Sequence, residues 1–166
     1  SAALVTVDGD VSVAGDDTLG SISSQQTANN SFGSLTIASG GTYSATSGTT
    51  TITKNTGAGS GRALYCHNAG VFTHNKGLLK ATASSADLEF TSQSETNNPL
   101  YDFEATQYAV AAANEWTVLN NMTIANGFQF NGGAGRAKVY GIMKQTGGTY
   151  NASDVSSSTD HFFNHY

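Results

Sequence analysis

Residues Leu35 to Thr53 read LTIASGGTYSATSGTTTIT and carry the pattern from which we predict the fold. Apolar and small polar residues alternate within it, and Gly40-Gly41 interrupts the alternation. A period of two places successive side chains on opposite faces of a strand, and glycine clusters form the turns between strands. The stretch therefore predicts short strands at 35–37 and 49–53, with turns between them.

The same pattern extends outward from this stretch in both directions. Toward the N-terminus, Val5, Val7, Val11 and Val13 alternate with polar residues. Toward the C-terminus, alternation predicts strands at 63–65, 71–73, 78–81, 88–90, 116–119, 122–124, 128–130, 139–143 and 149–150. The segment 106–115 departs from this pattern, because its run of alanines predicts either a short helix or a loop that packs small side chains.

Several segments of the chain also resemble one another. The matches are LTIASG at 35–40 with MTIANG at 122–127, GSGRA at 59–63 with GAGRA at 133–137, and GGTYSA at 40–45 with GGTYNA at 147–152, with GVFT at 70–73 as a looser copy. Repeated units that cannot bury their own apolar face must stack on neighbours. The repeats therefore predict an all-β solenoid with loops of variable length. A β-sandwich or jelly roll is the alternative fold, and chance matches in a chain rich in Gly, Ser and Thr are the alternative explanation of the repeats.

The segments 35–53 and 70–76, the latter reading GVFTHNK, resemble coils of the parallel β-helix proteins found in phage virions and bacterial surface adhesins. The resemblance covers roughly residues 4–150 and lies in the general pattern of the segments, not in a diagnostic motif. It implies a right-handed parallel β-helix that serves as a stiff projection on a capsid, a tail or a cell surface. In such a stack, coils of about 20 to 29 residues would rise about 4.8 Å each.

Composition narrows the class of protein. No linker divides residues 1–166, so we expect a single domain, and the 8 Phe, 7 Tyr and 1 Trp predict a packed core. A net charge of −5 with scattered basic residues argues against a nucleic-acid partner. Cys66 is alone and excludes an intrachain disulfide. No apolar run reaches the roughly 18 residues that cross a bilayer, and segment 1–7 lacks signal-peptide features, so we expect neither a membrane segment nor an export signal.

Two short segments concentrate acidic residues. Asp87 and Glu89 alternate with apolar residues, as do Asp102 and Glu104, so each pair should lie on one side of a strand. Stacked together, the four carboxylates would form an acidic ladder. Such a ladder suggests a glycoside hydrolase or lyase of the β-helix type as one alternative, although a solvated face, with or without a bound cation, is the favoured interpretation.

Other candidate ligand groups do not form a recognised site. Asp8-Gly9-Asp10 and Asp16-Asp17 could supply oxygen ligands to calcium, but they fail the EF-hand pattern and suit turns. His161 with His165, and Cys66-His67 with His74, match no zinc spacing. We therefore expect no metal site and no cofactor, with calcium left open.

The sequence thus predicts a non-enzymatic virion structural protein on the particle surface, either a capsid decoration or cement subunit or a tail component. Its partners would be a major capsid protein or sister subunits in a homo-oligomer. The N-terminal segment 1–33 and the C-terminal tail 154–166 are the expected assembly arms, with Leu4, Val5, Phe162, Phe163 and Tyr166 as contacts. The alternatives are a bacterial adhesin or extracellular filament subunit, and a glycan-binding or glycan-cleaving tailspike domain.

Overall fold

A computed structural model describes residues 5–13, 21–23, 27–57, 61–111, 115–130, 136–147 and 150–151. Within these ranges the protein is all-β and contains no helix. The strands are β1 (Val5–Val13), β2 (Ser21–Ser23), β3 (Asn30–Ile37), β4 (Thr42–Ser44), β5 (Thr49–Ile52), β6 (Leu64–Cys66), β7 (Val71–Thr73), β8 (Leu78–Ala81), β9 (Ala86–Phe90), β10 (Asp102–Ala105), β11 (Ala109–Ala111), β12 (Glu115–Val118), β13 (Met122–Ile124), β14 (Phe128–Phe130), β15 (Arg136–Val139), β16 (Met143–Gln145) and β17 (Tyr150–Asn151).

Every pair of strands described in the structure is parallel. The antiparallel sheets of a β-sandwich or jelly roll are therefore not what these residues form. Paired residues lie between 19 positions apart, as in Phe103 and Met122 (122 − 103), and 29 positions apart, as in Thr49 and Leu78 (78 − 49). The variable offset matches the expected coil length and shows that the turns absorb the differences.

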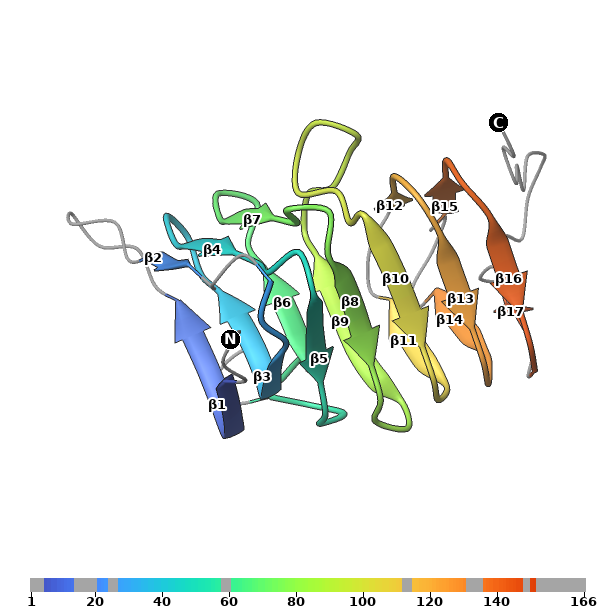
Figure 1. Ribbon diagram of the computed structural model, residues 1–166, viewed down its shortest axis with the longest axis horizontal. Helices are drawn as coiled ribbons and strands as arrows, with labels where there is room; N and C mark the ends of the chain where they lie inside the picture. Colours follow the sequence, from blue (N-terminus) through green and yellow to red (C-terminus); the bar gives the residue numbers. More distant parts are fainter. Residues whose placement is uncertain are drawn as a thin grey trace.

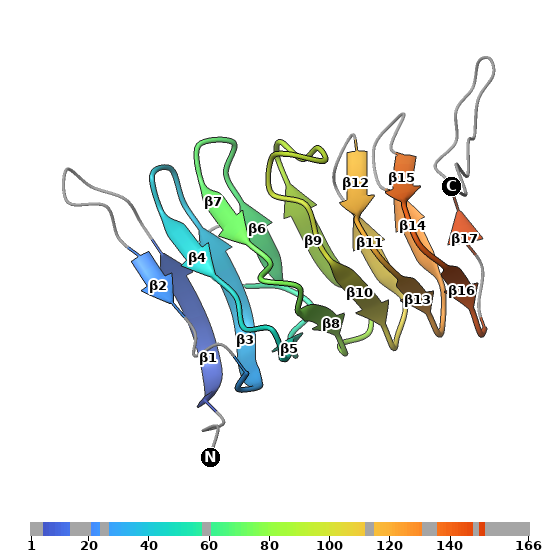
Figure 2. The ribbon, with the colours of Figure 1, turned by 45° about the horizontal axis from the view of Figure 1, so that its top comes forward.

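Successive strands occupy three sides of the molecule in turn. Side A consists of residues 30–32 of β3 with β5, β8, β10, β13 and β16, and side B of residues 35–37 of β3 with β6, β9, β11, β14 and β17. Side C holds β2, β4 and β7 and, farther along, β12 and β15. We call one pass of the chain over these sides a layer. The layers follow one another along the longest axis in sequence order (Figures 1 and 2).

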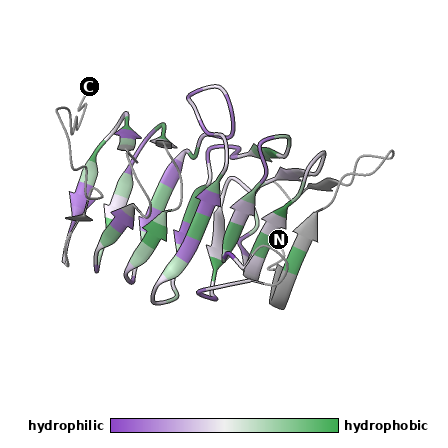
Figure 3. Cartoon of the chain, turned by 180° about the vertical axis from the view of Figure 1, so that it is seen from behind, coloured by the Kyte–Doolittle hydropathy of each residue, from purple (hydrophilic) through white to green (hydrophobic). Residues whose placement is uncertain are grey.

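The interior of the stack is apolar because side chains alternate between buried and partly exposed positions along many of its strands. In β5, β8, β9, β10, β11 and β13, every second side chain is buried. Seen from behind, hydrophobic and hydrophilic residues alternate along many of the strands (Figure 3). A one-residue slip would expose the whole apolar set, so burial fixes the register of each strand.

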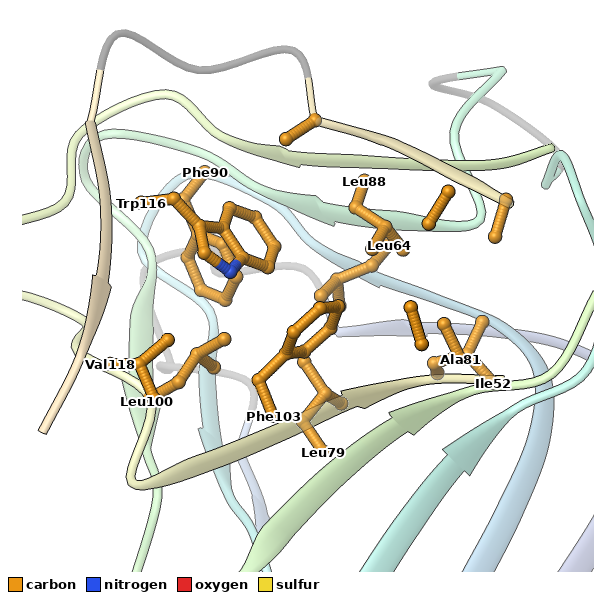
Figure 4. Close-up of a cluster of buried hydrophobic side chains, with 14 of the residues drawn as sticks. Ile52, Leu64, Leu79, Ala81, Leu88, Phe90, Leu100, Phe103, Trp116 and Val118 are labelled. Atoms are coloured by element: carbon orange, nitrogen blue, oxygen red, sulfur yellow. The ribbon is translucent and has the colours of Figure 1, made fainter. Parts of the chain in front are cut away.

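Aromatic rings form a continuous row through this interior. Successive ring centroids lie 5.2 to 6.0 Å apart, and most neighbouring rings meet edge to face. The row runs through Phe32, Tyr43, Phe72, Phe90, Trp116, Phe103 and Phe128. Figure 4 shows its central part, where Phe90, Trp116 and Phe103 meet Leu64, Leu88 and Leu100. Such pairs each add roughly 0.5 to 1.5 kcal/mol beyond burial, so the row links neighbouring layers.

Residues 106–115 correct one expectation. Ala109–Ala111 form strand β11, and the chain resumes in β12 at Glu115, so the predicted short helix is wrong for the part that the structure describes. Ala109 and Ala111 are fully buried against the interior. Pairing with β9 and β14 on both edges outweighs the modest intrinsic helix preference of alanine.

The repeated segments also occupy places that the sequence did not predict. LTI at 35–37 lies on side B, whereas its copy at 122–124 lies on side A. The two copies of GGTY likewise precede different sides, because Thr42–Ser44 lies on side C and Tyr150 on side B. The looser copy GVFT is the one that stacks directly, since Tyr43 pairs with Phe72. The repeating unit is therefore one turn and one strand, and not a complete layer.

Candidate interaction surface

The four acidic residues singled out from the sequence lie on two different sides of the stack. Asp87 and Glu89 belong to β9 on side B, and Asp102 and Glu104 belong to β10 on side A. All four point outward, because the intervening Leu88 and Phe103 are buried. The structure brings together the members of each pair but does not join the two pairs into one ladder.

On side B, the acidic pair is bound by an arginine from the neighbouring layer. Arg62 Nε donates to Glu89 Oε2 at 2.8 Å, and Arg62 Nη1 makes a very short contact with Asp87 Oδ2. Burial lowers the pKa of Arg62, but Asp87 and Glu89 outweigh burial and raise it overall. The side chains of Arg62, Asp87 and Glu89 are 20 to 31% exposed. The two-pronged contact of the Arg62 guanidinium therefore connects β9 to the chain just before β6 at a partly buried site.

On side A, the carboxylates are bound in a similar way. Lys80 Nζ lies 3.0 Å from Glu104 Oε1, in the register that pairs β8 with β10. Asp102 Oδ1 accepts hydrogen bonds at 2.9 Å from Asn120 Nδ2 and from the backbone N–H of Asn121 in the next layer. The carboxylates on both sides therefore connect layers.

Cys66 is buried in the core, and the two described histidines accept hydrogen bonds within turns. Burial raises the pKa of the Cys66 thiol to about 12, so the thiol stays protonated near neutral pH. His67 Nδ1 accepts from the Ala69 N–H at 3.1 Å, and His74 Nδ1 accepts from the Lys76 N–H at 2.9 Å. Among the described residues, no group of three or more His, Cys, Asp or Glu could hold a metal ion.

The predicted assembly contacts are mostly beyond what the structure describes. Leu4, Phe162, Phe163 and Tyr166 lie outside the described residues, as do Asp16, Asp17, His161 and His165 and the tail 154–166. Val5 begins β1, whose backbone pairs with Asn30 of β3. Asp8 and Asp10 lie in the same strand, and residues 30–33 of the predicted N-terminal arm belong to β3.

The feature that sequence analysis missed is the loop from Thr91 to Pro99, between β9 and Leu100. It projects beyond the neighbouring turns (Figure 1, yellow-green loop at the top). In the layers on either side, the chain forms β7 and β12 on side C at this point. The loop replaces most of a side C strand, and Leu100 alone returns to form a bridge with Val118.

Two side-chain amides take the place of the missing strand. Asn98 Oδ1 accepts from the Phe72 N–H at 2.7 Å, and Asn98 Nδ2 donates to the Gly70 carbonyl at 3.1 Å. Gln93 Oε1 accepts from the Thr117 N–H at 2.9 Å, while its Nε2 donates to the Asn98 carbonyl at the same distance. Asn98 thus bonds to the edge of β7 and Gln93 to the edge of β12, where buried backbone groups need partners.

The outer part of the loop is polar and is held by hydrogen bonds within the loop and by one from Tyr140. Ser94 and Asn97 exchange backbone bonds, Asn97 Nδ2 donates to Ser92 Oγ at 3.0 Å, and Tyr140 Oη donates to Glu95. Glu95 and Thr96 are exposed at the tip. Loops held by a rigid scaffold are common recognition elements, so this loop is the candidate interaction surface. The run 91–99, with no apolar residue before Pro99, was the available signal.

Beside this loop, a small depression lies at the corner where side C meets side A. His74, Tyr101 and Asp102 line its outer part, and Phe72, Leu79 and Leu100 its inner part. It has no room for a water molecule. His74 and Tyr101 stack there with ring centroids 5.6 Å apart, which closes the surface between two layers.

None of the described segments forms a helix long and apolar enough to cross a bilayer. Comparison with protein-family models, curated protein sequences and solved structures finds no match to this chain.

Proposed function

We propose that the chain is a right-handed parallel β-helix that acts as a non-enzymatic structural subunit and works by presenting its surface. The parallel pairing of each strand with the next layer supports the helical architecture. The right hand rests on the general preference of parallel strand–crossover–strand connections.

One observation carries the non-enzymatic role. The outward carboxylates bond to Arg62, Lys80, Asn120 and Asn121 of neighbouring layers, and the two acidic pairs lie on different sides of the stack instead of forming one site. Glycoside hydrolysis needs two carboxyl groups on either side of one bond, with one kept protonated. Asp102 and Glu104 instead lie along one strand and are engaged with different partners, which favours a structural role.

We further propose that this subunit belongs to a virion, as a capsid decoration or tail component, and assembles with sister subunits or a capsid protein. The proposal rests on the resemblance of segments 35–53 and 70–76 to phage β-helix coils. The apolar residues Leu4, Val5, Phe162, Phe163 and Tyr166 are the proposed contacts. A cell-surface filament subunit or adhesin is the alternative, and an experiment must distinguish it from a virion protein.

The test compares the full chain with a variant that lacks residues 160–166. Light scattering after gel filtration should show a defined oligomer for the full chain and a smaller species for the variant, with identical circular dichroism. A matched control replaces exposed Ser84, in the turn between β8 and β9, by Ala and should leave the oligomer unchanged. Unchanged assembly of the truncated chain would reject the tail contacts.

Immunogold labelling then decides the setting. Antibodies against the chain should decorate purified virus particles, and labelling of cell envelopes alone would favour the adhesin. Incubation with a panel of polysaccharides should release no new ends. Cleavage that disappears in a variant with Asp102→Asn and Glu104→Gln would overturn the non-enzymatic role.

A further inference from the structure

The turn between β13 and β14 contains an asparagine followed directly by a glycine, Asn126-Gly127. In this pairing, the backbone nitrogen of the second residue can attack the side-chain carbonyl of the first and close a five-membered ring. Glycine permits the attack because it has no β-carbon and accepts many backbone conformations. The φ angle of Gly127 is 104°, which is already outside the range that other residues favour.

The attacking nitrogen must first lose its proton, so a hydrogen bond from that N–H protects the asparagine before it. Three other turns of the molecule provide this protection. The N–H groups that follow Asn68, Asn75 and Asn120 donate to His67 Nδ1 at 3.1 Å, His74 Nδ1 at 2.9 Å and Asp102 Oδ1 at 2.9 Å. In the sequence copy of this turn, Gly40 N–H donates to the Ala69 carbonyl at 3.0 Å, and Ser39 replaces the asparagine.

Asn126 lacks this protection. The Gly127 N–H donates no hydrogen bond to any residue that the structure describes. The Asn126 side chain is exposed, and its Nδ2 donates to Gln107 Oε1 at 3.2 Å. The amide that would be attacked is therefore exposed, and the attacking nitrogen, although Gly127 is buried, is not held by a hydrogen bond from its N–H to a described residue.

From this contrast we propose that Asn126 is a modification site at which the folded chain deamidates spontaneously. The Gly127 nitrogen forms a bond to Asn126 Cγ, the Cγ–Nδ2 bond breaks, and ammonia leaves with the proton from the Gly127 amide. Water then opens the imide at either carbonyl and yields aspartate or isoaspartate. No oxidant, metal or enzyme is needed.

The product changes the surface and the turn. Aspartate places a new negative charge beside Gln107 and removes the donor of their hydrogen bond. Isoaspartate also lengthens the backbone by one carbon between β13 and β14, which pair with β10 and β11 of the preceding layer. Conversion should therefore accumulate with the age of the protein and loosen this corner of the stack.

Tandem mass spectrometry of aged protein tests the site. The full chain carries Asn131→Gln, because Asn131-Gly132 is a second such pair outside the described residues. Folded and urea-unfolded samples are incubated at mildly alkaline pH in heavy-oxygen water, which marks each converted residue. Asn126 in the folded protein should convert within about tenfold of its unfolded rate, as expected for an unprotected amide.

Asn68 serves as the internal control, and its folded rate should fall much further below its own unfolded rate. The variant Asn126→Ser, which copies Ser39, should lose the heavy-oxygen label in this turn while its circular dichroism stays unchanged. If Asn126 remains intact in the folded protein after the unfolded chain has converted, the proposal is overturned. Equal relative rates at Asn126 and Asn68 would also overturn it, because the turn geometry would then play no part.

Discussion

A β-carbon placed on Gly77 would lie 2.0 Å from the Thr46 carbonyl oxygen of the neighbouring layer. Backbone meets backbone at this corner, so no flexible side chain can move aside. Gly77→Ala should therefore lower the free energy of unfolding by at least about 2 kcal/mol through forced displacement of the layers. Urea denaturation followed by circular dichroism measures the change.

Gly61 provides the matched control. Its φ angle is 71°, but no described atom lies within 4 Å of a β-carbon added at this residue, so Gly61→Ala imposes only backbone strain. That strain should cost about 1 kcal/mol. Equal losses for the two variants would show that close contact between layers is not what requires glycine at Gly77.

His74 should make stability depend on pH. Burial, followed by the charge of Lys76, lowers the pKa of His74 below its ordinary value of 6.5. The unfolded chain then binds a proton more readily than the folded chain, so stability is full above pH 6.5 and falls as the pH drops toward the folded pKa. Protonation at Nδ1 would also break the hydrogen bond from the Lys76 N–H.

Urea denaturation between about pH 8 and pH 5 checks this prediction against His74→Asn, since asparagine keeps an acceptor for the turn but does not titrate. The wild type should lose more stability than the variant over this range. Parallel pH profiles would contradict a role for His74, because the other histidines are common to both proteins.

At the scale of elements, the loop 91–99 depends on one buried amide. Asn98 is 5% exposed, has a φ angle of 50° and bonds to both Phe72 and Gly70. Asn98→Ala leaves a buried N–H and a buried carbonyl without partners, which should cost about 2 to 4 kcal/mol. Thermal unfolding monitored by circular dichroism measures the loss.

Asn98→Gly separates the effect of backbone strain from the effect of the lost side-chain amide. Glycine tolerates the positive φ angle but supplies no amide. It should recover only a small part of the loss. Thr96→Ala on the exposed tip of the same loop should change stability by less than about 0.5 kcal/mol. Full recovery by glycine would mean that backbone strain, and not the amide, explains the effect of Asn98→Ala.

A comparison of the predicted and observed strands shows which elements a sequence pattern can locate. Alternation predicted strands such as 78–81 and 122–124 within a residue, because each needs only one apolar face toward the interior. It missed β11, where alanines are fully buried and small side chains suit the crowded interior. It also missed the bridging role of Asn98 and Gln93, because an amide that bonds to a distant strand leaves no periodic trace.

At the scale of the whole molecule, strand pairing links each layer directly to its immediate neighbours along one axis. Phe32 and Phe128 lie at opposite ends of the aromatic row, whereas Phe90 and Trp116 touch with centroids 5.6 Å apart. Substitutions at distant, unconnected sites should add in free energy within about 0.5 kcal/mol, and contacting pairs should not.

A pair of double-mutant cycles in urea tests this expectation. Phe32→Leu with Phe128→Leu should show negligible coupling, and Phe90→Leu with Trp116→Phe should show roughly 0.5 to 1.5 kcal/mol. Strong coupling in the distant pair would mean that the layers rearrange together, contrary to nearest-neighbour stacking.

Local alternation was enough to predict an all-β chain, the positions of most strands and the side chains that face the interior, because a two-residue period is a property of each strand alone. Which strands share a side, in contrast, depends on the folded stack. It separated Asp87 and Glu89 from Asp102 and Glu104, since turns of unequal length set the side that each strand reaches. It also chose the partners of Arg62 and Asn98, because those contacts join residues more than 20 positions apart that only stacking brings together.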